Sequence, residues 1–261
     1  MNIKKNEKTN KWVDTHCHIQ HTNLDVEKVD LSNIEWLLIP GVNVKSSLSA
    51  SEFSSTLPIE SYWGAGLHPH EASNLNRQKN ELLKLFQLAD AIGETGLDYY
   101  RNLSDKASQI KSFEMHVASA IELEKTLIVH CRDSFEDVHR IIEQNDFTAP
   151  VVLHSWTGGS KWTKKFMDLN VYFSFSGIIT YVSAKDIQIA CEKIPMSNIL
   201  LETDTPYLVP STVDDEVNQP RYIENTAMEV ARIKNIDVQT LSSVTIENSS
   251  KCFIEKKGPN E

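Results

Sequence analysis

The stretch KWVDTHCHIQH (Lys11–His21) begins like a buried strand and ends in histidines one residue apart. Residues i and i+2 of a strand point to the same face, so an extended chain would project His16 and His18 side by side. That arrangement suits two imidazoles that bind one metal ion. Two surface histidines near the N-terminus are the alternative, and the rest of the sequence must decide between them.

Seven more short apolar runs follow the first one, and each leads into a polar or helical segment. The eight runs are KWVDTHC (11–17), EWLLIPGV (35–42), ESYWGAG (60–66), ADAIGETG (89–96), TLIVHC (126–131), PVVLHS (150–155), VYFSFS (171–176) and NILLETD (198–204). Several are almost continuously apolar, which is typical of parallel strands buried on both faces. Strands that alternate with helices eight times in about 250 residues predict an α/β fold, the (β/α)8 TIM-like barrel.

Apolar residues at spacings of three and four predict helices between the later strands. These repeats are Ile110–Phe113–Val117–Ile121, Phe135–Val138–Ile142, Trp162–Phe166–Leu169, Ile187–Cys191–Ile194 and Ile223–Ala227–Val230. The first two connections are short, so we do not expect a full helix after the first strand. A doubly wound open sheet is the rival fold, and it is disfavoured because no glycine fingerprint follows the first strand.

Length and composition are those of one globular domain. The chain has 261 residues, 40% hydrophobic and 24% charged, and no linker or internal repeat. We therefore expect a disordered lead at 1–10, a single barrel domain at 11–256 and a tail at 257–261. No apolar run approaches the roughly 20 residues that cross a bilayer, and the N-terminus lacks the apolar core of a secretory signal. Four cysteines without a C-x-x-C pair indicate reduced, buried thiols and a cytoplasmic protein.

The formal net charge of −10 argues against a protein that coats nucleic acid electrostatically. It leaves open an enzyme that meets nucleic acid at a metal-filled pocket, because bound cations are often the largest local charges.

Metal-binding residue types stand at the ends of several predicted strands. They are His16, His18, Glu94, His130, His154 and Asp204. In a barrel, the carboxyl ends of the strands meet at one rim, where active sites lie. Four histidines and two carboxylates at one rim predict a metal site. A single histidine after an apolar strand is more often a hydrogen-bonded core residue, so the prediction depends on the whole set.

Six motifs in order resemble the TatD family of metal-dependent deoxyribonucleases, within the amidohydrolase-like hydrolases. They are DTHCH, GLHPHEA, IGETGLDYY, IVHCRDS, LHSWTGG and LLETDTPYL, and the resemblance runs from about residue 12 to residue 254. It implies a barrel with two metals on its rim. One metal would be held by His16, His18 and Asp204, the other by His130 and His154, and Glu94 would bridge them. The sequence departs from the family in having Trp156 where phenylalanine is common, and in a short segment between Thr22 and Ile34.

The predicted ligands suit phosphodiester hydrolysis, because two divalent ions can activate water, stabilise the phosphate and assist the leaving oxygen. Imidazole and carboxylate ligands admit zinc, manganese or magnesium. We assign Asp204 and Glu94 as catalytic, with Asp204 orienting or deprotonating the water. Asp14 would either receive a histidine N–H or form a turn. Glu202 shares the face of Asp204 and would hydrogen-bond inside the barrel or assist a metal.

Further rim residues are predicted to contact substrate. Arg132 would clamp a phosphate, with an ion pair to Asp133 or Glu136 as the alternative. His68 would touch substrate, whereas His70 is expected in a loop or at a helix start. Three aromatic residues would stack on an unpaired base or else pack in their loops: Tyr99, Tyr100 and Trp156.

The sequence thus predicts a nuclease that removes nucleotides from single-stranded or frayed DNA ends, with RNA as an alternative substrate, no membrane contact and no indication of oligomeric state. A metal-dependent hydrolase of an aminoacyl ester, or of another small ester or amide, is the first rival. A polymerase-and-histidinol-phosphatase type phosphoesterase is disfavoured, because its last motif is usually Asp-x-His and this chain has Asp204-Thr205-Pro206. A non-enzymatic binding module would require missing ligands, and none is missing.

Overall fold

The computed structural model describes residues 10–21, 24 and 26–255. The predicted lead, apart from Asn10, and the predicted tail lie outside the described residues. So does residue 256, the predicted end of the domain.

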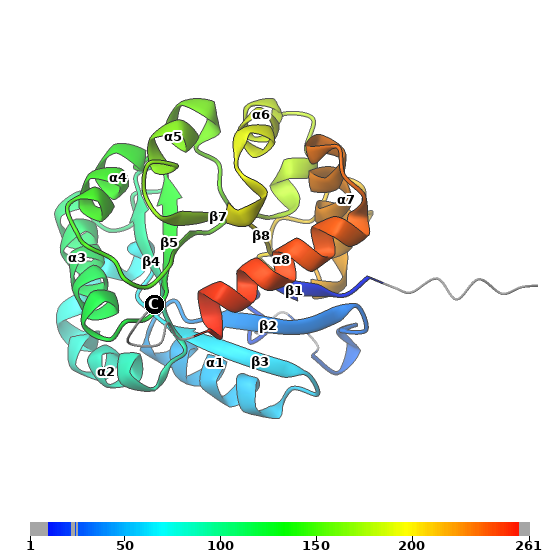
Figure 1. The fold of residues 1–261 in the computed structure, drawn as a ribbon. Helices are drawn as coiled ribbons and strands as arrows, with labels where there is room; N and C mark the ends of the chain where they lie inside the picture. The colour runs from blue at the N-terminus through cyan, green and yellow to red at the C-terminus, as the bar shows by residue number, and fades with distance from the viewer. Residues whose placement is uncertain (1–9, 22–23, 25, 256–261) are drawn as a thin grey trace, which may run out of the picture.

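Eight parallel strands form one sheet in which each strand pairs with the next one in the sequence (Figure 1). Their bounds are β1 Trp12–Asp14, β2 Ile34–Pro40, β3 Glu60–Ala65, β4 Ala91–Asp98, β5 Leu127–Arg132, β6 Val151–Leu153, β7 Val171–Phe175 and β8 Ile199–Leu201. All eight lie within the predicted runs or extend them by one or two residues. Sequential parallel pairing is the topology of a TIM-like barrel.

The barrel closes where the chain leaves its first and last strands. The Thr15 N–H donates to the Leu201 carbonyl (3.1 Å), and the Asp204 N–H donates to the His16 carbonyl (2.9 Å). These bonds join the segment that follows β1 to the last residue of β8 and to the segment after it. A closed ring confirms the predicted barrel and rules out the open doubly wound sheet.

The helices surround the barrel. Their bounds are α1 Val44–Thr56, α2 Leu75–Leu88, α3 Lys106–Glu122, α4 Phe135–Glu143, α5 Gly159–Phe166, α6 Lys185–Lys193, α7 Ile223–Lys234 and α8 Val238–Phe253. The five predicted repeats fall on α3 to α7, except that Leu169 lies three residues beyond the end of α5 and Ile194 directly after the end of α6. Within the described part of the first connection there is only a short 3-10 helix, Val26–Lys28, as expected from its length. No helix of the described residues is long and apolar enough to span a membrane.

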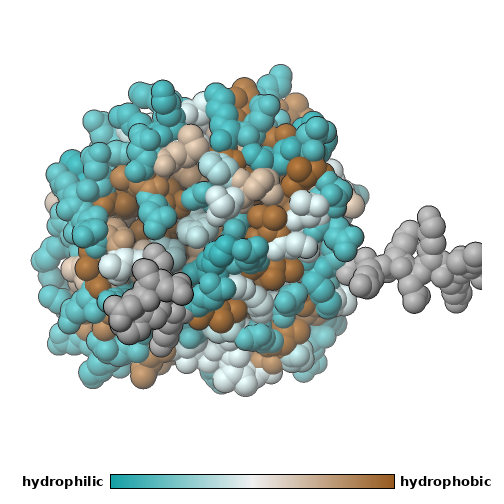
Figure 2. All heavy atoms as spheres, in the orientation of Figure 1, coloured by the Kyte–Doolittle hydropathy of each residue, from teal (hydrophilic) through white to brown (hydrophobic). Residues whose placement is uncertain are grey.

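Helix α8 covers the end of the barrel at which the strands begin. Phe253 packs on Trp36 of β2, the Thr126 hydroxyl before β5 donates to the Cys252 carbonyl, and the Asn248 amide donates to the Ile199 carbonyl of β8 (2.9 Å). The space-filling view from this side mixes hydrophilic and hydrophobic residues (Figure 2). With α8 over this end, the carboxyl ends of the strands form the open end of the barrel, where active sites of this fold lie.

The interior of the barrel changes from apolar to polar along β5, β6 and β8. Ile128, Val152 and Leu200 belong to the apolar cluster inside the barrel. Two residues further on, and therefore on the same face, the strands place His130, His154 and Glu202. Because side chains two residues apart share a face, the strand face that packs the barrel interior also carries the polar residues at the strand ends. The four cysteines are free and buried, as predicted.

Candidate metal centre

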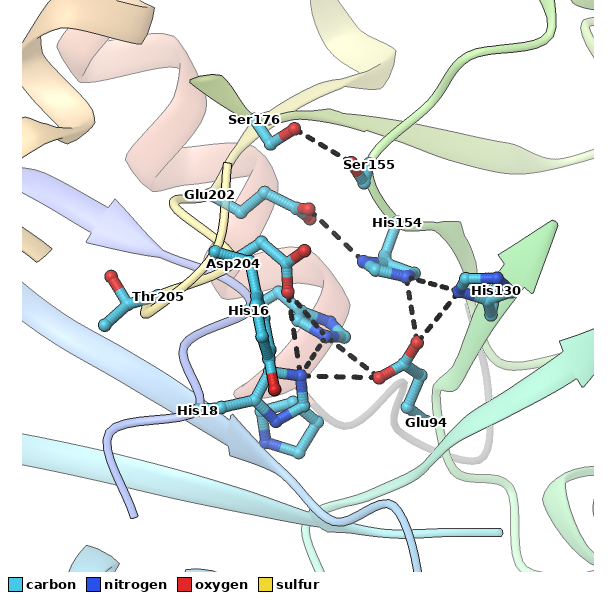
Figure 3. A network of polar contacts seen from close by, with 12 residues as sticks. His16, His18, Glu94, His130, His154, Ser155, Ser176, Glu202, Asp204 and Thr205 are labelled. Carbon is cyan, nitrogen blue, oxygen red and sulfur yellow. Dashed lines mark hydrogen bonds and ion pairs between the residues drawn. The ribbon is translucent and has the colours of Figure 1, made fainter. Parts of the chain in front are cut away.

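The six predicted ligands gather at the carboxyl ends of the strands (Figure 3). Five of them line a cavity of about 840 Å³, and the sixth, His16, is fully buried. The cavity-lining ligands are His18, Glu94, His130, His154 and Asp204. The chain therefore brings together residues up to 188 positions apart, the separation of His16 and Asp204.

A first cluster surrounds the histidine pair that follows β1. The Nε2 atoms of His16 and His18 lie 3.2 Å apart. Glu94 Oε2 lies 3.3 Å from the His16 nitrogen and 3.4 Å from the His18 nitrogen. Asp204 Oδ1 lies 3.8 Å and 3.6 Å from the same two atoms. Two nitrogens and two carboxylate oxygens therefore face one point.

A second cluster lies on the other oxygen of Glu94. Its Oε1 atom is 3.0 Å from His130 Nδ1 and 3.0 Å from His154 Nε2, and these two nitrogens are 3.2 Å apart. Glu94 thus directs one oxygen to each cluster, which is the arrangement of a bridging carboxylate.

The donor sets fit divalent cations. Ligands about 2.1 Å from a tetrahedral ion lie about 3.4 Å from one another, close to the spacings found in both clusters. Asp204 Oδ1 is buried and has no hydrogen-bond partner among the described residues. A buried oxygen without a donor is costly, and a cation at this point would satisfy it. Imidazole nitrogens with carboxylate oxygens suit zinc, manganese or magnesium.

The burial of the clusters shifts the pKa values of their carboxylates and imidazoles. Burial raises the pKa of Asp204 to about 7 and lowers that of His16 to about 4. Burial also acts to raise the pKa of Glu94, but the imidazoles around it outweigh burial and hold its pKa well below the ordinary value. A cation between these groups would favour the ionised carboxylates and the neutral imidazoles, which are the forms that bind metal.

The backbone around the first cluster is fixed by Asp14. Its carboxylate is fully buried and accepts from the backbone N–H groups of His16 (3.3 Å) and Thr203 (2.9 Å) and from the Thr203 hydroxyl (2.5 Å). Asp14 therefore ties the end of β1 to the end of β8. Among the described residues it accepts from no histidine ring nitrogen, and His16 Nδ1 has no hydrogen-bond partner, so the first of its two predicted roles was wrong. Asp204 itself has a left-handed backbone (φ 59°), a strained conformation that recurs at functional sites.

His68 also reaches the second cluster, with its Nε2 atom 3.3 Å from Glu94 Oε1. Its Nδ1 atom accepts from the backbone N–H of His70 (3.2 Å). This bond caps the 3-10 helix Pro69–Asn74, in which His70 is the second residue. Burial lowers the pKa of His68 to about 4, so the ring is neutral and its single proton is on Nε2. His68 is therefore a hydrogen-bond donor to Glu94. His70 stands at a helix start, as predicted.

Of the other predicted substrate contacts, only Arg132 and Tyr100 line the cavity. The Arg132 guanidinium lies over the Tyr100 ring (4.1 Å to the ring centre) and makes no ion pair with a described residue, so the Asp133 and Glu136 alternatives were wrong. Tyr100 is 64% exposed.

Trp156 and Tyr99 are placed differently from the prediction. Trp156 is 2% exposed, packs on Phe166 and Phe173, and donates from Nε1 to the Thr163 hydroxyl (2.7 Å). It is a core residue, so its predicted contact with substrate was wrong. The Tyr99 hydroxyl donates to Asp137 (2.8 Å), and Tyr99 is not among the residues that line the cavity. Its side chain packs between helices, so the prediction for Tyr99 was also wrong.

Sequence reasoning missed two residues of the site. Asp98 is fully buried and contacts His130 and His70, and Tyr207 lines the cavity with its ring edge toward His18. Asp98 stands four residues after Glu94 on the same strand, and Tyr207 stands three residues after Asp204. Alternation along β4 was a signal for Asp98. Glu202, which the sequence did single out, hydrogen-bonds to His154 (3.3 Å).

A barrel that gathers histidines and carboxylates into two joined clusters at its strand ends has the architecture of a metal-dependent hydrolase. The chain belongs to the TatD family, because the profile described as TatD related DNase matches residues 13–254.

Two relatives span nearly the same length. An uncharacterized metal-dependent hydrolase of Buchnera aphidicola is 35% identical over 92% of this chain and 98% of its own. The uncharacterized metal-dependent hydrolase YcfH of Escherichia coli K12 is 30% identical over 92% and 95%. The crystal structure of YJJV, a TatD homolog from Escherichia coli K12, shares the fold with a TM-score of 0.82, 19% identity and coverage of 94% and 98%.

Proposed function

We propose that this metal-dependent hydrolase is a deoxyribonuclease that removes nucleotides from single-stranded or frayed DNA ends by two-metal phosphodiester hydrolysis. The observation that carries the proposal is the position of the Glu94 carboxylate between two separate histidine clusters, with one oxygen facing each. Two bound cations would polarise the phosphate and assist both the attacking and the leaving oxygen. The family description, TatD related DNase, supports the same chemistry.

The protein's own residues would orient the attack. Asp204 lines the cavity, with one oxygen toward the His16–His18 pair. In this role it accepts the proton of the attacking water. His68 donates to Glu94 and holds that carboxylate in place.

The rim of the cavity supports a substrate with an accessible phosphate. Arg132 has no ion-pair partner among the described residues, so its N–H groups are available to phosphate oxygens. Tyr100 and Tyr207 are 64% and 50% exposed at the same cavity and offer ring faces or edges to an unpaired base. The net charge of −10 gives the protein little to hold long duplex with, which favours chain ends. The free, buried cysteines support a cytoplasmic setting.

Labelled substrates presented to metal-free and metal-loaded protein test the proposal. The panel contains linear single-stranded DNA, closed circular duplex, single-stranded RNA and an aminoacyl ester, each with zinc, manganese or magnesium. We expect the linear DNA strand to be shortened from an end, the circle to stay intact, and activity to disappear with chelator. Cleavage of the aminoacyl ester alone would establish the rival hydrolase. Equal cleavage of the circle and the linear strand would refute the preference for ends.

A further inference from the structure

Three histidines surround the same oxygen of the bridging carboxylate. Glu94 Oε1 lies 3.3 Å from His68 Nε2, 3.0 Å from His130 Nδ1 and 3.0 Å from His154 Nε2. A neutral imidazole carries one N–H, and the nitrogen without it has the lone pair that binds a metal. The hydrogen-bond partner of the ring nitrogen that points away from Glu94 decides which of the two nitrogens carries the proton. The hydrogen bonds behind each ring therefore assign its role.

Behind His130 lies Asp98. The Asp98 Oδ2 atom is 3.1 Å from His130 Nε2. An ionised carboxylate only accepts hydrogen bonds, so it draws the ring proton to Nε2 and leaves the Nδ1 lone pair toward the cavity.

Glu202 lies behind His154 (Figure 3). In contrast to His130, the His154 ring points its Nε2 atom toward Glu94 and its Nδ1 atom away from it. Glu202 Oε1 is 3.3 Å from His154 Nδ1, so the proton belongs on Nδ1 and the Nε2 lone pair faces Glu94. Behind His68 there is a donor instead, the backbone N–H of His70, which places the His68 proton on Nε2. Two of the three rings thus present a lone pair to the cluster, and the third presents its N–H.

We propose that Asp98 and Glu202 are positioning residues that make His130 a metal ligand through Nδ1 and His154 a metal ligand through Nε2. Asp98 is the more constrained of the two. Its Oδ2 atom is also 2.9 Å from His70 Nε2, its Oδ1 atom accepts from the Arg101 N–H (2.8 Å), and its side chain is fully buried. Both oxygens are used as acceptors, so the carboxylate cannot be replaced by a group with one acceptor.

The strand geometry places Asp98 against His130. In the pairing of β4 with β5, Gly96 lies opposite His130 and Asp98 lies opposite Arg132. A Cβ atom at Gly96 would come within 2.0 Å of the His130 carbonyl oxygen, and Gly96 has φ 134°. Only glycine fits at this position, and it allows the two strands the close approach on which the contact depends.

The two amide substitutions should therefore differ. In Asp98→Asn the amide has one oxygen for two acceptor positions. If its NH2 group faces His130, Nε2 must accept, the ring proton moves to Nδ1, and the lone pair toward the cavity is lost. In Glu202→Gln a single oxygen suffices for His154, so the amide can preserve the tautomer. We expect Asp98→Asn to weaken the binding of one zinc ion at least about tenfold, and Glu202→Gln to weaken it less.

The test uses zinc alone, with no substrate, so it does not depend on the proposed nuclease activity. Calorimetric titration of metal-free protein with zinc gives the affinity at each site. Nitrogen-15 NMR of labelled histidines in the zinc-loaded protein reports the protonated ring nitrogen. Asp137→Asn is the matched control, because Asp137 also accepts hydrogen bonds from side chains but lies at Tyr99 and Arg140.

The wild-type spectrum should contain one histidine with its proton on Nε2 and metal on Nδ1, and Asp98→Asn should remove that signal while the control keeps it. A wild-type spectrum without a histidine bound through Nδ1 would overturn the proposal, even if the Asp98 variant failed to fold. So would an Asp98→Asn protein with unchanged affinity for both zinc ions.

Discussion

His116 on α3 should make the stability of the protein depend on pH. The ring is fully buried, its Nε2 atom accepts from the Leu67 N–H (3.0 Å), and its Nδ1–H donates to the Ser112 carbonyl (2.7 Å). Burial lowers the pKa of His116 to about 4, from an ordinary value of 6.5. Because Leu67 precedes His68, this neutral ring also holds the backbone that leads into the metal centre.

The size of the effect follows from the two pKa values. The unfolded chain takes up a proton near pH 6.5 and the folded chain only near pH 4, so the free energy of unfolding falls as the pH drops through this window. Above pH 7 the contribution is constant. The loss is about 2 kcal/mol at pH 5 and about 3 kcal/mol at pH 4, at 1.36 kcal/mol per pKa unit.

Urea unfolding of metal-free wild type and His116→Gln between pH 7.5 and 5 measures this loss. Glutamine offers an acceptor and a donor that do not titrate, so the other acidic and basic groups contribute equally to both proteins. We expect the wild type to lose about 2 kcal/mol more than the variant between pH 7.5 and pH 5. Parallel losses in the two proteins would refute the assignment of a buried, neutral His116.

Three further substitutions separate the roles of site and core residues. Asp204→Asn keeps one oxygen but loses the charge and basicity that accept a proton, so turnover should fall at least about 100-fold while metal content, measured by elemental analysis, falls only in part. A near-normal rate would remove Asp204 from proton transfer. His130→Ala should instead lose one metal ion. The buried Cys131 beside it would have to shift to replace the imidazole, and Asp98 contacts the ring nitrogen that points away from the cluster. Full metal content would contradict the place of His130 as a ligand. Trp156→Ala should destabilise folding by about 3–5 kcal/mol in urea titrations and leave KM unchanged, since Trp156 is a core residue; a rise in KM at full stability would return it to the substrate site.

The sequence by itself predicted the barrel and the set of candidate ligands. Apolar runs and helical repeats are local patterns, and their alternation limits the fold to a barrel or an open sheet. Once the runs are parallel strands, their carboxyl ends share one rim, so the residue types at those ends predict the site from the sequence alone. Helix α1 was less visible, because its buried residues are Ser47 and Ala50 and give no apolar repeat.

Tertiary structure alone decided what each side chain faces. Trp156 and Tyr100 are both aromatic residues just after a strand, yet one is 2% exposed and the other 64%. Loop geometry and packing set that difference, and neither is written in local spacing. The same holds for Asp98, whose partners His70 and His130 lie 28 and 32 residues away. Which nitrogen of a histidine faces a metal depends on a hydrogen bond across strands, so only the folded chain can fix it.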